Sequence, residues 1–422
     1  MDALLDAIAF LSLATAGIGI VYLLFSAAAV LRFRGSGIIP APFVRGEQLS
    51  HMAKVPPHAN ALPGTREGLY PNVTILVPLC GAEPGLKRRL ESLCDQDYRS
   101  RLQIICGVAD SGDGAAEVVR ALMRERPDAE IQLCVDPRTH GRNAKVSNLI
   151  NMIERADHDI FFLIDSDIEA PPDLVSRLAG LLRQAGVGAA TCLYYGAPAG
   201  GLWARLSAAG ITSHFLPNAV AGLSLNLANP CFGATIALTR GMLWRIGGLR
   251  PFADCLWDDY AIGEAVRQTG SEVAIASIAL PHLCAERSAS ELLLRELRSA
   301  RTIRCIASRG YFGNSVTHPL GFALIALLSG WIVPAIVASV LAIAARAWLC
   351  RSVSRRFGAA AVPLWLQPLR DILAFVVYLG GSFGRKIVWR GREYRVDSNG
   401  ALTPARNPGA RSEEVRTRFT AS

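Results

Sequence analysis

Two aspartates follow the most apolar short segment of the chain, and their spacing suits a metal site. Residues 160–164 are all apolar, and Asp165, Ser166 and Asp167 come directly after them. Such a run predicts a strand that is buried on both faces, and ligands of open α/β sheets bind at the carboxyl ends of their strands. Two carboxylates placed there can hold a hard divalent cation together with the phosphates of a substrate. A simple turn is the alternative, because Asp and Ser are common turn residues.

Polar groups also accompany a second strand and the segment that follows the third. Asp110 comes directly after the apolar run 102–108, where a carboxylate can hold a ribose or the edge of a base. It can equally cap the helix that is predicted to follow. The segment 141–148, with sequence GRNAKVSN, contains Arg142 and Lys145, which can bind phosphate oxygens. A solvated basic loop is the alternative for this segment.

Two further sets of charges lie nearer the C-terminus. Asp258 and Asp259 precede a predicted helix at 261–268, which they can simply cap. They can also supply a general base, because neighbouring like charges raise a carboxylate's pKa toward neutrality. Arg295 and Arg298 lie on a predicted amphipathic helix, which can rest on anionic lipid, bind a diphosphate leaving group, or do both.

Strands and helices must alternate to position these residues. Strand patterns cover residues 73–78, 102–108, 130–135 and 160–164, and helical patterns lie between them at 86–93, 115–126 and 149–155. Such alternation predicts βαβ units and a mostly parallel sheet. The carboxyl ends of the strands, and the polar residues that follow them, then meet at one edge.

The N-terminal segment predicts a membrane helix. Residues 3–31 are apolar except for Asp6, and this exceeds the roughly 20 residues that span a bilayer. Arg32 and Arg34 follow, so the positive-inside rule places the N-terminus outside and the next domain in the cytoplasm.

The C-terminal part contains two more apolar runs. Residues 319–349 predict one long helix or a hairpin that breaks at Pro334. The run at 372–383 is short for a span and is expected to lie in the interface or to re-enter. The basic clusters at 351–356 and 385–392 should both lie on the cytoplasmic side.

Composition agrees with membrane segments attached to a soluble core. Of the 422 residues, 51% are hydrophobic and 19% are charged, and the net charge is +9. No basic stretch alternates with aromatic residues as in nucleic-acid-binding proteins, so we expect no nucleic-acid partner and infer an anionic membrane surface or a phosphate-bearing substrate. The 10 cysteines contain no CxxC pair and suggest free thiols in a reducing compartment.

Taken together and in order, the charged motifs resemble a known family. They are Asp110, the segment 141–148, Asp165-Ser166-Asp167, Asp258-Asp259-Tyr260 and Arg295-Glu296-Leu297-Arg298. The chain resembles the GT-A-type membrane glycosyltransferases of families 2 and 21, which carry a D, D, D, (Q/R)xxRW pattern. It is most similar to ceramide glucosyltransferases and their bacterial relatives, including the hopanoid-biosynthesis glycosyltransferases, to which the GRNAKVSNLINM stretch points.

The resemblance implies a role for each position. Asp110 corresponds to a uridine or ribose contact and Lys145 to a donor-phosphate contact. Asp165 and Asp167 correspond to the metal and diphosphate site, with Mn²⁺ or Mg²⁺ as the cofactor. Asp259, beside Asp258, corresponds to the catalytic base.

Three more positions follow from the same resemblance. Arg295 and Arg298 correspond to the arginines that bind the leaving diphosphate. His214 matches a histidine near the acceptor site, although a buried core histidine is an equal alternative. The expected Trp after Arg298 is Ser299 in this chain, which weakens any claim about stacking of a sugar or acceptor at that position.

The implied organisation is a Rossmann-like nucleotide-sugar-binding domain between membrane helices. Its expected segments are a transmembrane helix (1–34), a linker (35–70), the GT-A domain (71–290), an interfacial helix with the RxxR motif (291–315), a transmembrane helix or hairpin (316–350), a basic loop with an interfacial, re-entrant or transmembrane segment (351–390) and a disordered tail (391–422). The small apolar residues at 190–245 suit either an α/β core or a groove for a lipid acceptor.

The implied function is an inverting transfer from a UDP-sugar to a lipid hydroxyl at a bacterial inner membrane, by a multi-pass protein with a cytoplasmic catalytic domain. UDP-N-acetylglucosamine and a hopanoid polyol such as bacteriohopanetetrol are the first expectation. UDP-glucose and ceramide are the alternative. A processive polysaccharide synthase and a non-catalytic membrane protein with the same fold remain as further alternatives.

Overall fold

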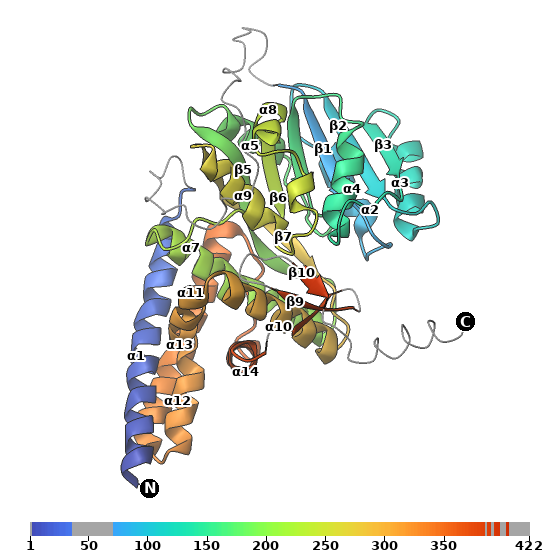
Figure 1. Cartoon of the computed structure of the whole chain (residues 1–422). Coiled ribbons are helices and arrows are strands. Elements are labelled where there is room, and N and C mark those ends of the chain that lie inside the picture. Colours follow the sequence, from blue (N-terminus) through green and yellow to red (C-terminus); the bar gives the residue numbers. More distant parts are fainter. Residues whose placement is uncertain (1, 36–70, 385, 390–391, 397–401, 405–422) are drawn as a thin grey trace, which may run out of the picture.

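The structure is a computed structural model in which residues 2–35, 71–384, 386–389, 392–396 and 402–404 are described. A sheet with helices on both faces stands above a shaft formed by α1 (Asp2–Arg32), α12 (Pro319–Leu328) and α13 (Ile332–Phe357) (Figure 1). The predicted linker lies outside the described residues, apart from its first residue.

The larger sheet has seven strands in the order β3-β2-β1-β4-β6-β5-β7. The strands are β1 (Val73–Pro78), β2 (Leu102–Val108), β3 (Glu130–Val135), β4 (Ile160–Ile164), β5 (Val187–Pro198), β6 (Thr235–Thr239) and β7 (Glu272–Cys284). Neighbouring strands are parallel, except that β6 runs antiparallel to β4 and β5. The prediction of an α/β domain with a mostly parallel sheet is confirmed. The predicted strand 160–164 has the bounds of β4, and Asp165 and Asp167 follow it as expected.

Both faces of the central strands are buried. In β4, Ile160, Phe162 and Ile164 pack into a core with α2 (Leu86–Cys94), α3 (Gly114–Glu125) and α5 (Leu174–Leu182). Phe161 and Leu163 pack on the other face with α4 (Ala144–Ile153), α8 (Arg240–Arg245) and α9 (Asp258–Gln268). Alternate residues of one strand thus enter two cores, which explains its uninterrupted apolar sequence.

Two helices begin earlier than predicted. α4 starts at Ala144, so most of the predicted loop 141–148 is helical; the side chain of Asn143 accepts hydrogen bonds from the backbone N–H groups of Lys145 and Val146. This cap satisfies donors that a helix start leaves free. α9 starts at Asp258, so both aspartates lie in its first turn rather than before it.

The shaft contains two helices, α1 and α13, that are long and apolar enough to cross a membrane. α12 and α13 form a hairpin, but the break lies at residues 329–331 and not at Pro334. Gly330 adopts a φ of +91°, which favours glycine, whereas Pro334 lies in the first turn of α13, where a proline is tolerated. The indole Nε1 of Trp331 donates to Asp6 Oδ1 at 2.9 Å and joins this turn to α1.

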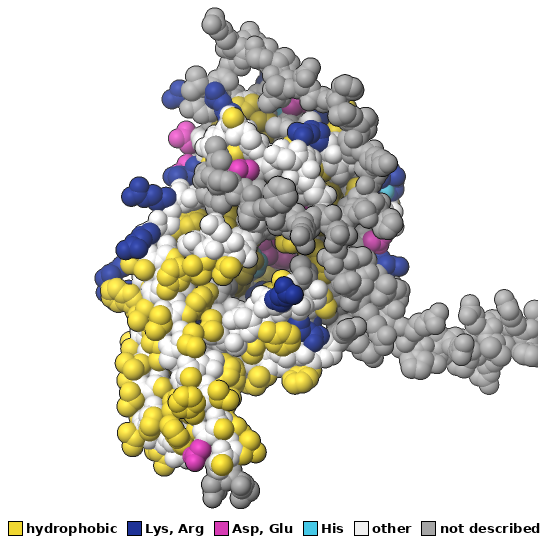
Figure 2. Space-filling view, turned by 60° about the vertical axis from the view of Figure 1, so that its left-hand side comes forward, with side chains coloured by type: hydrophobic (Ala, Val, Ile, Leu, Met, Phe, Trp, Pro, Cys, Tyr) yellow, Lys and Arg dark blue, Asp and Glu magenta, His cyan; other side chains and the backbone are white. Residues whose placement is uncertain are grey.

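The shaft exposes an apolar surface. Figure 2 shows hydrophobic side chains along the length of the shaft. The exposed residues include Phe10, Leu11 and Val21 of α1 and Val333 and Val340 of α13. An apolar surface of this extent is unusual on a water-soluble monomer and suits lipid.

Helices between the sheet and the shaft connect the two. They are α6 (Leu202–Gly210), the π-helical turn η1 (Ile211–Phe215), α7 (Leu216–Ser224), α10 (Ala289–Ile306), α11 (Ser308–Gly313), the 3₁₀ turn η3 (Asn314–Thr317) and α14 (Leu366–Gly381). α14 begins before the predicted apolar run 372–383 and includes Arg370 and Asp371, whose charges are buried and paired.

A second sheet lies near the C-terminus. It contains β8 (Lys386–Trp389), β9 (Arg392–Val396) and β10 (Leu402–Pro404), in the order β10-β9-β8. The expectation of a disordered tail from 391 is therefore wrong for the residues of β9 and β10, whose backbones pair with each other. Residues 405–422 lie outside the described part.

Candidate active site

The carboxyl edge of the sheet brings three of the predicted motifs together. Lys145 of α4 extends its Nζ to 2.6 Å from Asp165 Oδ1 and 3.8 Å from Asp258 Oδ2. One ammonium group therefore joins the segment after β4 to the start of α9. Burial lowers the pKa of Lys145, but Asp165 and Asp258 outweigh this effect and leave the pKa raised, so the side chain carries its charge.

The two aspartates of the Asp165-Ser166-Asp167 segment have different surroundings. Burial raises the pKa of Asp165 to about 6, with Lys145 opposing the rise and Asp167 adding to it. Burial also acts on Asp167, but His282, whose Nε2 lies 3.0 Å from Asp167 Oδ2, lowers the pKa of Asp167 overall. The other oxygen, Asp167 Oδ1, is buried and has no hydrogen-bond partner among the described residues.

His282 comes from the end of β7 and was missed by the sequence analysis. The backbone N–H of Leu283 donates to Asp167 O at 2.8 Å, and Ile168 forms an antiparallel bridge with His282. These backbone contacts place the imidazole beside Asp167. Burial lowers the pKa of His282, but the negative charge of Asp167 outweighs this effect and raises the pKa to about 10. No local motif marks His282 in the sequence, since its position depends on the register of β7.

Arg89 of α2, also missed, holds the same segment from the other side. Its side chain is 5% exposed. Its Nε donates to Ser166 O at 2.5 Å, and its Nη1 donates to Pro84 O at 2.7 Å. Its Nη2 donates to Glu83 Oε2 at 3.1 Å. A buried guanidinium with these partners fixes the backbone between the two aspartates.

Asp258 and Asp259 are neighbours with different contacts. Asp258 is buried and accepts a hydrogen bond from Asn143 Nδ2 at 3.1 Å, besides facing Lys145. Asp259 accepts from the backbone N–H of Gly233 at 2.9 Å and is only partly buried. Burial, and then the charge of Asp258, raise the pKa of Asp259 to about 6. Asp258 therefore joins α4 to α9, whereas Asp259 is a carboxylate poised to accept a proton near neutral pH.

Arg295 lies at the same edge. Its Nη1 is 2.5 Å from Glu286 Oε1, and its Nη2 donates to Ser207 Oγ at 2.7 Å. It lines a cavity of about 290 Å³ together with Glu83, Asp167, His282 and Glu286. The cavity thus combines the cation of Arg295 with the carboxylate of Asp167.

Arg298 shows a different environment from Arg295. It is half-buried on α10, and burial, with Arg295 adding to it, lowers the pKa of its guanidinium. Ser299, at the position of the expected Trp, is exposed and donates to Arg295 O at 3.1 Å. Its side chain closes a helical hydrogen bond and presents no stacking surface.

Asp110 is exposed at the end of β2, where its Oδ1 accepts from the backbone N–H of Gly112 at 3.0 Å. The helix cap that was the alternative interpretation belongs to Asp113 instead, whose side chain accepts from Ala115 N–H. Asp110 thus lies at the same edge as the other aspartates, without a capping role.

The predicted acceptor residue His214 contacts a different group of residues. It lies in η1, with its Nε2 2.9 Å from Asp371 Oδ1 of α14 and its ring stacked on His318 at 6.0 Å between centroids. Neither of these contacts involves the aspartates described above. Its place near an acceptor remains a prediction.

Tyr194 is a further residue that the sequence did not single out. Its ring stacks on His282 and on Phe215, with centroids 5.2 and 4.6 Å apart. Burial and the charges of Asp259 and Asp167 raise its pKa. Tyr194 therefore lies between the aspartates of the edge and the turn η1.

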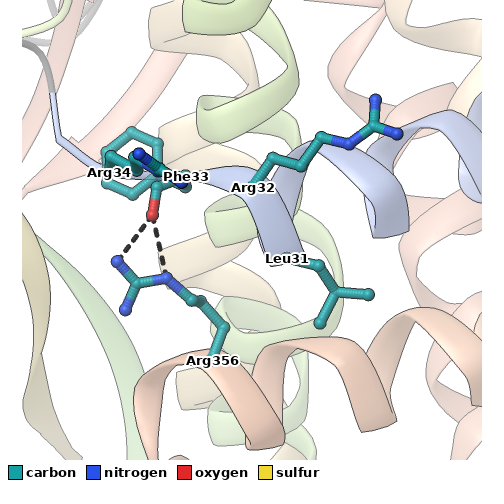
Figure 3. Close-up of a pocket in the computed structure, with 5 residues that line it drawn as sticks. All are labelled: Leu31, Arg32, Phe33, Arg34 and Arg356. Atoms are coloured by element: carbon teal, nitrogen blue, oxygen red, sulfur yellow. Dashed lines mark hydrogen bonds between the residues drawn. The ribbon is translucent and has the colours of Figure 1, made fainter.

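The larger cavity is elsewhere. It measures about 680 Å³ and lies at the C-terminal ends of α1 and α13 (Figure 3). It is lined by Leu31, Arg32, Phe33, Arg34 and Arg356. There Arg356 donates through Nε to Phe33 O at 2.8 Å. The cavity contains none of the predicted site residues, so its size does not make it the candidate site.

The donor atoms at the sheet edge fit a hard cation that also binds a substrate's phosphates. The described residues contain no cluster of three or more His, Cys, Asp or Glu side chains arranged around a metal position. Mg²⁺, however, is commonly bound through one or two carboxylates plus phosphates. Asp167 Oδ1, buried without a partner, and the neighbouring Asp165 supply such carboxylates.

Comparisons with known proteins add curated relatives. The chain is 24% identical to ceramide glucosyltransferase 1 of Caenorhabditis elegans, over 53% of this chain and 47% of that protein. It is 29% identical to the ceramide glucosyltransferase of Candida albicans, over 32% of this chain and 26% of that protein. It is 32% identical to an N-acetylglucosaminyltransferase of Rhizobium leguminosarum bv. viciae, over 28% of this chain and 27% of that protein. The matches thus span less than half of each relative.

Among solved structures, the chain is similar to a mannosyltransferase from Pyrobaculum calidifontis in complex with GDP-mannose and Mn²⁺. The identity is 18% and the TM-score is 0.48, over 90% of this chain and 97% of that chain.

The family model described as glycosyl transferase family 21 matches residues 45–402, which is most of the chain. This match agrees with the resemblance carried by the five motifs. The chain therefore belongs to glycosyl transferase family 21.

Proposed function

We propose that the protein is a membrane-anchored inverting glycosyltransferase that moves a sugar from a UDP-sugar to the hydroxyl group of a lipid. The observation that carries the proposal is the cluster in which Lys145 joins Asp165 to Asp258, beside Asp259. It combines, at one sheet edge, a cation for phosphate, carboxylates for a metal and a partly buried base.

In this proposal the acceptor hydroxyl attacks C1 of the sugar while Asp259 takes its proton. The C1–O bond to UDP breaks, and the electron pair leaves with the diphosphate. Lys145, Arg295 and Arg298 neutralise the charge that develops on UDP, and Asp110 holds the uridine or its ribose. A Mn²⁺ or Mg²⁺ ion, held by Asp165 and Asp167 when bound, supplies further positive charge at the diphosphate.

Several features support a lipid acceptor. α14, together with Trp365 just before it, exposes an apolar row that includes Leu369, Ile372, Val376 and Leu379, and its spacing is that of one helix face. α10, which carries Arg295 and Arg298, packs against α14 and exposes Leu294 and Ile303. We infer that both helices lie at the cytoplasmic surface of a bacterial inner membrane, with α1 and the α12–α13 hairpin anchored in it.

The sugar and the lipid are proposed as two alternatives that fit about equally. One is N-acetylglucosamine transferred to a hopanoid polyol such as bacteriohopanetetrol. The other is glucose transferred to ceramide, which the names of the Caenorhabditis elegans and Candida albicans relatives favour. A processive polysaccharide synthase is less well supported, because Ser299 replaces the aromatic residue expected after Arg298.

The test is transfer by the purified protein in detergent. UDP-N-acetylglucosamine and UDP-glucose would each be offered with a hopanoid polyol or a ceramide, in the presence of Mn²⁺ or Mg²⁺. Asp259→Asn serves as the inactive variant, and Asp173→Asn, an exposed aspartate paired with Arg177, serves as the matched control.

Product on one lipid that is lost in Asp259→Asn and kept in Asp173→Asn supports the proposal and selects the acceptor. A lack of product on every lipid, with UDP-sugar still bound, contradicts the lipid acceptor and favours the polysaccharide alternative. A protein that binds no UDP-sugar contradicts the enzyme itself.

A further inference from the structure

Glu296 lies on α10 between Arg295 and Arg298, the two arginines that we assign to the diphosphate, and it forms an ion pair with Arg370 of α14. Glu296 accepts from Arg370 of α14 through both oxygens, Nη1 to Oε1 at 2.7 Å and Nη2 to Oε2 at 3.0 Å. The two side chains are 14% and 7% exposed. Such bidentate geometry fixes both the distance and the direction between the two helices.

α6 contacts Arg295 of α10 and Arg370 of α14. Ser207 accepts from Arg295, and one helical turn later Gly210 lies against Arg370. A Cβ at position 210 would lie 2.7 Å from the guanidinium carbon of Arg370, so the glycine leaves the space that this side chain occupies. Arg295 and the Glu296–Arg370 pair are thus held by the same short helix.

The next residue of α14 connects the pair to the shaft. Asp371 accepts from Arg346 Nε of α13 at 3.2 Å. Arg346 also donates to Ser213 O of η1 and to Thr317 O, each at 2.7 Å. Adjacent residues of α14 therefore pair with α10 on one side and with α13 on the other.

Burial of this ion pair needs an explanation other than stability. Replacing a buried ion pair by apolar residues of similar volume is often neutral or stabilising, because desolvation offsets the attraction of the charges. What an apolar contact lacks is a fixed direction between donor and acceptor. The pair lies next to Arg295, whose function in the proposed reaction requires such a direction.

We propose that Glu296 and Arg370 are positioning residues, which set the rotation of α10 so that Arg295 and Arg298 meet the diphosphate of the donor. The inference rests on the proposed function and deepens it. Neither residue touches the reacting atoms. Through Asp371 and Arg346, the orientation of the arginines depends on the packing of the helices that we place in the membrane.

The test compares Glu296→Gln, Arg370→Gln and the double variant in the full-length protein, by transfer kinetics and by direct binding of UDP. Arg304→Gln is the matched control, because Arg304 also joins α10 to this part of the chain, donating to Ser382 O at 2.6 Å, but lies further along the helix. Thermal unfolding of each variant in detergent measures folding separately.

Both single variants should lower kcat/KM by up to about 10²-fold, mainly through a higher KM for the UDP-sugar, as expected for misplaced binding groups. The double variant should be no worse than the singles, because the pair acts as a unit. The pH dependence of kcat should stay unchanged, since Asp259 is not disturbed. Arg304→Gln should lose stability without a change in donor KM.

An equal rise of donor KM in Arg304→Gln would overturn the inference, because general docking of α10 would then explain the effect. Folded single variants with wild-type UDP binding and kinetics would overturn it as well. A wild-type protein that neither binds nor transfers a UDP-sugar would instead contradict the proposed function.

Discussion

Two groups of charged residues in this molecule differ in how completely they are buried. At the sheet edge, Asp165 and Asp167 keep 30% and 31% of their side chains exposed, and Asp167 Oδ1 has no partner among the described residues. Between α13 and α14, Arg346 and Asp371 are 1% and 3% exposed, and Arg346 has partners on α14, η1 and η3.

This difference in burial separates side chains that can take part in chemistry from side chains that fix the packing of the helices. A partly exposed carboxylate can still bind a metal, and one with a raised pKa, such as Asp259, can accept a proton near neutral pH. A charge that is almost wholly excluded from solvent and held in an ion pair is out of reach of a substrate and fixes its neighbours instead. We expect substitutions in the first group to reduce chemistry with little effect on folding, and substitutions in the second to reduce folding first.

The largest effect is expected for Asp259→Asn. Loss of a general base typically costs about 10²- to 10⁴-fold in rate. The variant should lose kcat by this amount and retain UDP binding and thermal stability, measured by transfer kinetics, titration calorimetry and unfolding in detergent. A variant that keeps most of its kcat would show that Asp259 is not the base.

Asp371→Ala tests the other side of the comparison. It leaves the guanidinium of Arg346 buried without its carboxylate, and breaking a buried pair in this way costs about 3–5 kcal/mol. A clear fall of the unfolding temperature is expected. If the unfolding temperature stays within a degree or two of the wild type, the buried cluster does not hold the helices as described.

An intermediate effect is expected for Arg89→Met. Arg89 is buried like Arg346 and Asp371, but it supports the segment that carries Asp165 and Asp167. Hydrogen bonds to charged groups contribute about 1.5–3 kcal/mol. We expect a moderate loss of stability and a higher Mn²⁺ concentration for half-maximal activity, since the segment between Asp165 and Asp167 loses its support. Unchanged metal dependence would assign Arg89 to folding alone.

The smallest effect concerns pH. The base must be deprotonated, so activity should fall as pH drops through about 6, the raised pKa of Asp259. Asp258→Asn removes one of the causes of this rise and should shift the acid limb of the kcat profile to lower pH. An acid limb that moves upward or stays in place would mean that another group controls it.

The amino-acid sequence determined the strands of the core and most of the residues that meet at the candidate site. β1, β2 and β3 have the predicted bounds, because burial on both faces or a short apolar period leaves a clear local pattern. The family and the five charged motifs were also visible in the sequence. The start of α4 was missed, although Asn143 has a suitable capping side chain, because the polar residues around Lys145 resemble those of a loop.

Only the tertiary structure decided which side chains meet. His282 contacts Asp167 because β7 ends beside the segment after β4, and Arg89 reaches Ser166 from α2. Asp258 accepts a hydrogen bond from Asn143, whereas Asp259 accepts one from the backbone of Gly233 and stays partly exposed. This difference between the two aspartates depends on how α4 and α9 pack. The pairing of Arg370 with Glu296 likewise joins residues far apart in the chain. Local sequence patterns record burial and helix period, whereas these contacts depend on the register and packing of distant elements, which no local pattern contains.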